Sequence, residues 1–126
     1  LFRDSPLGNV IFDVHRYQCF AREDLDMDIH GHLQKAGVSW RAEAAAIQSG
    51  LGVPAICGEW SLGLDLKLGC PDPFQEDVAL RAYAAAQLLT FEHYRGWFFW
   101  SYRTETTPAW CFRDCVARGW LPPRFQ

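Results

Sequence analysis

The sequence lacks the features that mark several large classes of protein. No apolar run approaches the roughly 18–20 residues of a membrane-spanning helix. No cluster of lysine and arginine stands out, and a formal net charge of −3 does not favour binding to nucleic acid. The same small net charge, together with 49% apolar residues, excludes a disordered chain. We therefore expect a globular protein, and 126 residues fit one domain of ordinary size.

Cysteines are few and irregularly spaced, and no metal-binding pattern is present. The five are Cys19, Cys57, Cys70, Cys111 and Cys115. They form no CxxC pair, so no zinc site is expected. Their odd number leaves at least one free thiol unless it pairs between chains, and without the framework of a disulfide-stapled domain the redox compartment stays open. Residues 24–28 begin like a calcium loop, but Ile29 stands where such a loop needs glycine. We expect neither a metal nor a cofactor.

Aromatic residues, in contrast, are abundant. The chain contains nine Phe, four Tyr and six Trp residues. Tryptophan is large and amphipathic, so such a composition is typical of cores, of interfaces and of surfaces on which sugars stack.

Three short apolar runs alternate with helical patterns. The strands are expected at residues 9–14, 53–60 and 97–102, and the helices at 40–48, 75–93 and 110–118. Ser39 is expected to cap the first helix, after a polar loop with a short helix at 21–35. Because the strands are apolar throughout rather than alternating, they are expected to be parallel and joined by crossover helices. The predicted fold class is α/β with three βα units, too few for an eight-stranded barrel.

Polar and aromatic residues lie at the C-terminal side of each predicted strand, where (β/α) folds place their active sites. They are Asp13, His15 and Tyr17 on the first strand, Glu59 and Trp60 on the second, and Trp100, Tyr102, Arg103 and Glu105 on the third. Tryptophan faces stack on sugar rings, while histidine, tyrosine and arginine donate hydrogen bonds to hydroxyls. The pattern predicts a site for a neutral, hydroxylated ligand.

Glu59 is the most specific candidate for a catalytic residue in this set. A carboxylate directly after a buried strand can serve as a glycosidase nucleophile, although a helix-capping or ion-paired glutamate is the alternative. His15 and Tyr17 share one face of a strand because they are two residues apart. The alternative to a functional role for His15 is that of a structural histidine. The alternative for Trp100 is a place in the core.

Four motifs occur in order along the chain. They are Asp13-x-His15-x-Tyr17-Gln18-x-Phe20, Gly58-Glu59-Trp60-Ser61, Gly96-Trp97-x-Phe99-Trp100-Ser101 and Thr104-Glu105-x-x-Pro108-x-Trp110. Together they resemble the C-terminal part of glycoside hydrolase family 5, of the exo-β-1,3-glucanase type, over residues 9–123. The resemblance implies a TIM (β/α)8 barrel, of which residues 1–126 are the C-terminal segment with strands six, seven and eight.

The resemblance also implies roles for particular residues. Glu59 becomes the nucleophile of a retaining mechanism on β-glucan or a related β-glucoside, and Trp100 becomes the platform beneath the sugar. His15 and Tyr17 line the subsite, with Tyr17 orienting Glu59. Trp60 and Arg103 complete the expected substrate-binding set, Arg103 standing where the family has a lysine.

The family's acid/base glutamate is missing from this chain. It follows an asparagine, and the only asparagine here is Asn9. A retaining mechanism needs two carboxyl groups about 5–5.5 Å apart, so we expect no complete reaction unless Glu105 or a second chain supplies the other. The alternative is a non-catalytic truncated barrel that binds glucan or assembles as an oligomer. The substrate class favours a secreted or periplasmic protein.

Three parallel strands cannot bury both sheet edges or both faces. Apolar strand residues are expected to face helices or a barrel interior: Val10, Ile11, Phe12, Ala55, Ile56, Phe98 and Phe99. We expect their partner to be the N-terminal part of the same barrel or a second copy. The missing initiator methionine and signal peptide fit a trimmed chain or one that begins inside a longer protein.

Overall fold

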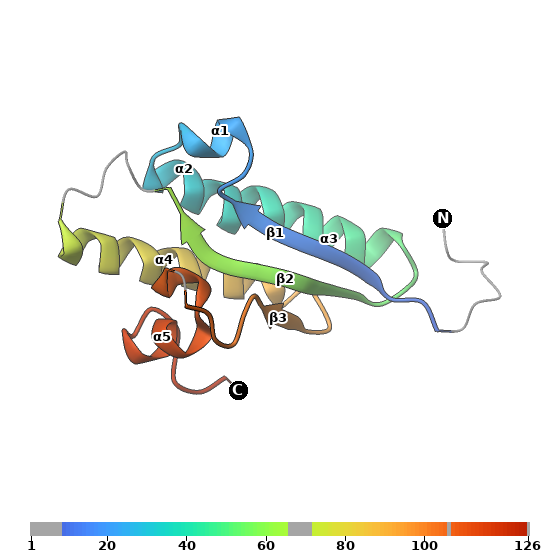
Figure 1. Ribbon diagram of the computed structural model, residues 1–126. Coiled ribbons are helices and arrows are strands. Elements are labelled where there is room, and N and C mark those ends of the chain that lie inside the picture. Colours follow the sequence, from blue (N-terminus) through green and yellow to red (C-terminus); the bar gives the residue numbers. More distant parts are fainter. Residues whose placement is uncertain (1–8, 66–71, 106, 126) are drawn as a thin grey trace.

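A computed structural model describes residues 9–65, 72–105 and 107–125 (Figure 1). In chain order the elements are β1 (Phe12–Gln18), α1 (Arg22–Leu25), α2 (Ile29–Gln34), a π-helical turn η1 (Lys35–Ser39), α3 (Trp40–Gly50), β2 (Ala55–Leu64), α4 (Pro73–Phe91), β3 (Trp97–Phe99), a 3₁₀ turn η2 (Pro108–Trp110) and α5 (Phe112–Ala117). Cys70 lies outside the described residues. Among the described helices, none has the length and hydropathy required to span a lipid bilayer.

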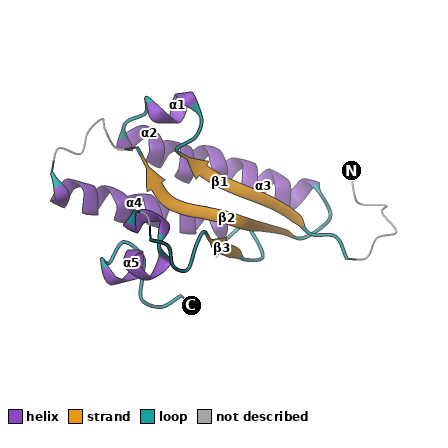
Figure 2. Cartoon of the chain, in the orientation of Figure 1, coloured by secondary structure: helices purple, strands orange, loops and turns teal. Residues whose placement is uncertain are grey.

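The three strands form one parallel sheet in the order β1-β2-β3 (Figure 2). The register begins with Phe12 opposite Ala55, and Cys57 lies opposite Trp97 on the other side of β2. The predicted α/β class with three parallel strands is therefore confirmed. Such an arrangement is consistent with part of a (β/α) barrel, because crossover helices join its parallel strands.

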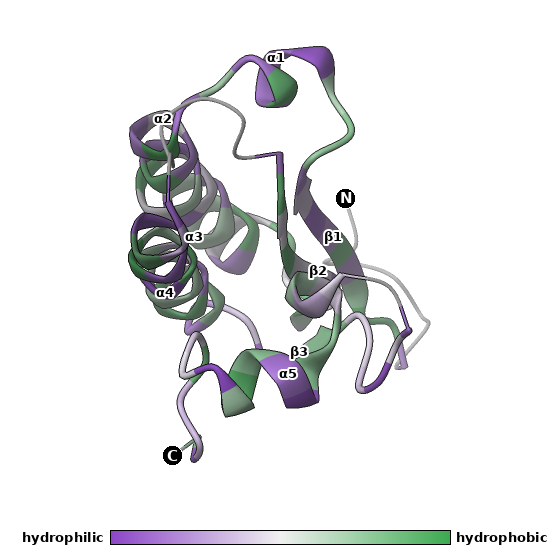
Figure 3. Cartoon of the chain, turned by 60° about the vertical axis from the view of Figure 1, so that its left-hand side comes forward, coloured by the Kyte–Doolittle hydropathy of each residue, from purple (hydrophilic) through white to green (hydrophobic). Residues whose placement is uncertain are grey.

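Helices α2, α3 and α4 lie along one face of the sheet, and Figure 3 shows them stacked on a single side of it. The core lies between these helices and the sheet. At its centre Trp60 is completely buried, with its ring 5.0 Å from those of Phe91 and Phe99 and 5.2 Å from that of Trp97. These edge-to-face contacts join β2, β3 and α4.

A buried cation ties β1 to the helical layer. Arg16 faces the helices, where its guanidinium donates to Glu43 on α3 at 2.9 Å and to the Tyr94 hydroxyl at 3.1 Å. It also lies over the Trp40 ring, 5.3 Å from the ring centroid. Burial lowers the pKa of Arg16, but the hydrogen bonds to Glu43 and Tyr94 outweigh it, so the pKa is raised overall. A buried charge persists only when it is paired in this way.

The strand and helix ends differ from the predicted ones. β1 starts three residues later than expected and runs on to Gln18, while β3 has only three residues. β1 extends beyond the apolar run because its polar residues Arg16 and Gln18 are also buried. Packing against the helices, and not a continuous apolar sequence, therefore sets the length of the strand. α4 covers Pro73–Phe91 rather than 75–93, since the Asp72 side chain accepts from Gln75 N at 2.9 Å and caps it.

The prediction that Ser39 caps a helix is wrong. Ser39 has helical backbone angles, φ −66° and ψ −51°, inside a helical stretch that continues from α2 through η1 into α3. The cap of this stretch is Asp28, whose side chain accepts from Gly31 N at 2.8 Å. Of the polar stretch that was expected to be mostly loop, a large part is therefore helix.

The second face of the sheet is open among the described residues. Ile11, Phe98 and Trp100 are 58%, 63% and 54% exposed. In contrast, Ala55 is buried, and Phe99 packs against the core. The apolar strand residues are thus divided between the two faces of the sheet: some pack on the helices, and the others lie on the open face.

Candidate functional site

The candidate site lies on the open face of the sheet, from the middle of β1 and β2 toward the carboxyl end of β1. His15 and Tyr17 of β1 and Glu59 of β2 meet there, although the two strands are separated by the whole α1–α3 segment (Figure 1). The side chains of His15 and Glu59 are 51% and 30% exposed. The structure therefore brings together three of the residues that the sequence singles out.

An irregularity in β2 decides which side of the sheet Glu59 occupies. Val14 lies opposite Cys57 and His15 opposite Glu59, so Gly58 is an extra residue in the register. Cys57 and Trp60 are both completely buried on the helical side. With strict alternation Glu59 would share the side of Cys57, and the bulge at Gly58 turns it to the open face instead.

Two β1 side chains lie against the Glu59 carboxylate, and one of them, Tyr17, is hydrogen-bonded to it. The Tyr17 hydroxyl donates to Glu59 Oε2 at 2.9 Å, and His15 Nδ1 lies 3.6 Å from the same oxygen. Partial burial, and then the hydrogen bond and charge of Glu59, raise the pKa of Tyr17 well above 10. Tyr17 therefore remains a protonated donor to Glu59 at physiological pH.

Asp13 is a site residue that the sequence analysis did not single out for a role. Its Oδ1 accepts from Gly58 N at 2.7 Å, and its Oδ2 lies 3.2 Å from His15 Nε2. The available signal was its spacing, since Asp13, His15 and Tyr17 are two residues apart and share one face of β1.

Trp110 is a second residue that sequence reasoning missed. Its ring stacks on that of Tyr17 with 5.3 Å between centroids and an angle of 21°. It also covers Gly63, where a Cβ would overlap the indole. Phe20, 71% exposed, meets the edge of the Tyr17 ring. Beside these aromatics lies a pocket of about 640 Å³ that Leu64 and Trp110 help to line.

The residues after β3 lie on the surface. Trp100 is 54% exposed, so it is not a core tryptophan; its backbone N–H donates to Trp60 O at 2.8 Å, and its peptide bond to Ser101 is cis. Arg103 and Glu105 are exposed in the loop that follows. All three side chains are accessible from the surface.

The expectation that Trp60 binds substrate is wrong. Its side chain has no exposed surface and points into the helical layer, among Phe91, Trp97 and Phe99. The physical reason is the bulge at Gly58: with strict alternation Trp60 would lie on the face opposite to buried Cys57, and the extra residue turns it inward instead.

Within the described residues, no group of three or more His, Cys, Asp or Glu side chains is arranged to hold a metal ion. His32 is completely buried, with Nδ1 2.8 Å from Gln18 Oε1. Asp24, in the stretch that begins like a calcium loop, pairs with Lys35.

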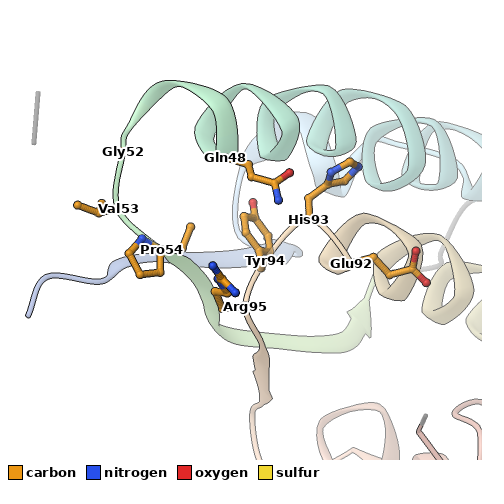
Figure 4. Close-up of a pocket in the computed structure, with 9 residues that line it drawn as sticks. Gln48, Gly52, Val53, Pro54, Glu92, His93, Tyr94 and Arg95 are labelled. Carbon is orange, nitrogen blue, oxygen red and sulfur yellow. The ribbon is translucent and has the colours of Figure 1, made fainter. Parts of the chain in front are cut away.

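A further pocket of about 530 Å³ lies at the opposite end of the sheet (Figure 4). Residues that precede β2 and β3 line it, including Pro54 and Arg95, together with Gln48 from α3. Because the pocket lies at the amino-terminal ends of the strands, it is separate from the Glu59 site.

Comparison with known proteins gives a consistent set of relatives. The chain is 28% identical to a probable glucan 1,3-beta-glucosidase A of Neosartorya fischeri, over 90% of this chain and 34% of the relative. It is 26% identical to a glucan 1,3-beta-glucosidase of Blumeria graminis, over 94% of this chain and 35% of the relative. It is 30% identical to the Candida oleophila glucan 1,3-beta-glucosidase, over 90% of this chain and 33% of the relative. No protein-family model matches the chain.

The resemblance to the exo-β-1,3-glucanase type is thereby confirmed. The chain spans about a third of the length of the curated relatives that it matches.

Proposed function

We propose that this chain forms part of a retaining glycoside hydrolase that acts on β-glucan, with Glu59 as the nucleophile. The observation that carries the proposal is the Glu59 carboxylate on the open face of the sheet, oriented by the 2.9 Å hydrogen bond from Tyr17. A donor to one carboxylate oxygen fixes the group and leaves the other oxygen as the attacking atom.

In the proposed reaction, Glu59 attacks the anomeric carbon of the sugar, and the bond from that carbon to the glycosidic oxygen breaks. The leaving oxygen takes a proton from an acid, and water then displaces Glu59 with release of its proton to the same group. Residues of this chain supply the nucleophile and Tyr17, which orients it. The acid is expected from another part of the protein, because the sequence contains no Asn-Glu pair.

Three side chains are proposed to contact the substrate. Trp100 offers an exposed indole as a stacking platform for a glucose ring. His15 and Arg103 offer hydrogen-bonding groups to sugar hydroxyls. The curated relatives are glucan 1,3-beta-glucosidases, so β-1,3-glucan oligosaccharides are the first substrates to test.

We further propose that the sheet corresponds to strands six, seven and eight of a (β/α)8 barrel, with residues 1–126 as its C-terminal segment. The open face with its exposed Phe98, and the single partner of β1 and of β3, support this proposal. The rest of the barrel, or a second copy of this chain, would then cover this face and pair with the edge strands.

A non-catalytic glucan-binding protein is the second candidate, and the missing Asn-Glu pair favours it. It would keep the Trp100 platform and the polar groups around Glu59 but lack the acid needed for turnover. The two candidates differ in whether Glu59 reacts with the sugar.

A mechanism-based label separates them. Protein expressed from the complete gene is incubated with 2,4-dinitrophenyl 2-deoxy-2-fluoro-β-glucoside, whose leaving group departs as the phenolate without needing an acid. Glu59 Oε forms a bond to the anomeric carbon as dinitrophenolate leaves. Peptide mapping by mass spectrometry is expected to find the fluoroglucosyl group on Glu59.

Glu59→Gln is the control, since it is expected to remain unlabelled while it still binds glucan oligosaccharides. A label on another carboxylate, or normal hydrolysis by Glu59→Gln, would contradict the assignment. Glucan binding by the wild-type protein without any label would support the non-catalytic candidate.

A further inference from the structure

Asp13 places its two carboxylate oxygens on two different partners at the candidate site. Oδ1 accepts from the backbone N–H of Gly58 at 2.7 Å, and Oδ2 lies 3.2 Å from Nε2 of His15. Gly58 directly precedes Glu59, and His15 Nδ1 lies 3.6 Å from Glu59 Oε2. Asp13 is thus connected to Glu59 by two routes, one through the backbone and one through the imidazole.

The backbone route concerns the bulge. Gly58 is the extra residue in the register of β2, so it has no Cα partner on β1. The Asp13 carboxylate supplies the acceptor for its N–H and occupies the space where a side chain would lie, because a Cβ at position 58 would overlap that carboxylate. The bulge that turns Glu59 to the open face therefore depends on both residues.

The imidazole route concerns the proton on His15. An ionised carboxylate only accepts hydrogen bonds, so the nitrogen facing Asp13, Nε2, carries the hydrogen. In the neutral ring Nδ1 is then an acceptor. The distance of 3.6 Å from Nδ1 to Glu59 Oε2 exceeds a hydrogen bond, so Nδ1 stays available to a donor such as a sugar hydroxyl.

We propose that Asp13 is a positioning residue for the Glu59 nucleophile. It holds the Gly58 amide, which sets the direction of Glu59, and it fixes His15 as an acceptor for a substrate hydroxyl beside the reacting carboxylate. This inference rests on the proposed function, in which Glu59 attacks the sugar. Two carboxylates face the imidazole, Asp13 on its own strand and Glu59 on β2, and the Tyr17 hydroxyl donates to the same Glu59 oxygen.

Asp13→Asn is the decisive variant, made in protein expressed from the complete gene. The asparagine oxygen can still accept from Gly58, but its amide group donates to His15 Nε2 and drives the ring hydrogen to Nδ1. We expect kcat to fall about ten- to hundredfold, the scale of one lost hydrogen bond at the reacting group, with a smaller change in KM. The ¹⁵N chemical shifts of His15 are expected to show the unprotonated nitrogen moving from Nδ1 to Nε2.

Asp28→Asn is the matched control. Asp28 also accepts from a backbone N–H, that of Gly31 at 2.8 Å, but on helix α2. It is expected to leave both kcat and the His15 shifts unchanged. Thermal unfolding of Asp13→Asn close to that of the wild type separates positioning from loss of the fold.

Wild-type kcat in Asp13→Asn, or a wild-type His15 ring already protonated on Nδ1, would overturn the inference. If the wild-type protein hydrolyses no glucan, the proposed function fails. The ring-nitrogen measurement then decides alone whether Asp13 controls His15, so the two failures are distinguishable.

Discussion

The Tyr17 hydroxyl donates a 2.9 Å hydrogen bond to Oε2 of Glu59 across 42 positions of sequence. Tyr17 is itself fixed by its stacked contact with Trp110, whose ring lies over Gly63. The direction of the Glu59 carboxylate thus depends on an aromatic contact between β1 and the chain that follows β3.

Tyr17→Phe is expected to lower kcat about ten- to hundredfold. A hydrogen bond to a charged group contributes about 1.5–3 kcal/mol, and each 1.4 kcal/mol corresponds to about a factor of ten. The phenylalanine ring keeps the stacking on Trp110, so stability is expected to change little. Steady-state kinetics on an activated β-glucoside, with thermal unfolding alongside, measures both quantities.

Tyr83→Phe provides the control for this substitution. Tyr83 is completely buried on α4, and within the described residues its hydroxyl has no hydrogen-bond partner. Removing that hydroxyl is expected to leave kcat unchanged. A Tyr17→Phe variant with wild-type kcat would show that the bond to Glu59 does not matter for turnover.

Trp100→Ala is expected to weaken glucan-oligosaccharide binding by about 1–3 kcal/mol, through loss of a large aromatic contact. Because the indole is 54% exposed, stability should fall only slightly. Isothermal titration calorimetry with Glu59→Gln as the background avoids turnover during the measurement. Unchanged affinity would exclude Trp100 as the platform.

Trp60→Ala is the comparison for Trp100→Ala, because it removes a buried tryptophan instead of an exposed one. This side chain is completely buried among three aromatic rings, so its removal is expected to cost about 3–5 kcal/mol of stability. Chemical denaturation would detect the loss. Wild-type stability in Trp60→Ala would contradict its place in the core.

Stability is expected to fall as the pH rises from 9 to 10. Burial, the largest cause, raises the pKa of Cys57 to about 12 and likewise that of Cys115 to about 12, from an ordinary value of 9.0. In that window the unfolded thiols lose protons that the folded thiols keep, so the free energy of unfolding falls by up to about 1.4 kcal/mol per pH unit for each thiol. Below pH 9 the two thiols are protonated in both states, so their contribution to the free energy of unfolding is fully present.

Cys57→Ala tests this dependence. Urea denaturation between pH 8 and pH 10 is expected to give a shallower decline than in the wild type, by about the contribution of one thiol. Cys115→Ala is expected to act alike, and the double variant to add the two effects. A decline as steep as that of the wild type in both single variants would mean that these thiols ionise in the folded protein.

The chain of 126 residues alone is not expected to be a stable monomer. Its sheet leaves Ile11, Phe98 and Trp100 mostly exposed, and burial of each is worth about 1.5–3 kcal/mol against a total stability of about 5–15 kcal/mol. Analytical ultracentrifugation at micromolar concentration is expected to show self-association or aggregation. A monomer with a cooperative unfolding transition would refute the expectation.

Much of the architecture could be predicted from local sequence. Apolar runs at the three strands and helical spacing between them gave the α/β class and the parallel order, because burial on folding follows hydrophobic pattern. The ends were less predictable: β1 continues through Arg16 and Gln18, whose polarity is offset by partners that only the fold supplies, such as Glu43 for Arg16.

For the candidate site, the sequence alone singled out chemically capable residues: a carboxylate, a histidine and a tyrosine at the predicted strand ends, with aromatics nearby. Tertiary structure alone decided which of them meet. The extra residue at Gly58 reverses the alternation of β2, so Glu59 joins Tyr17 on the open face while Trp60 enters the core. No sequence period encodes that reversal, because it depends on the Asp13 carboxylate of a neighbouring strand that holds the Gly58 amide.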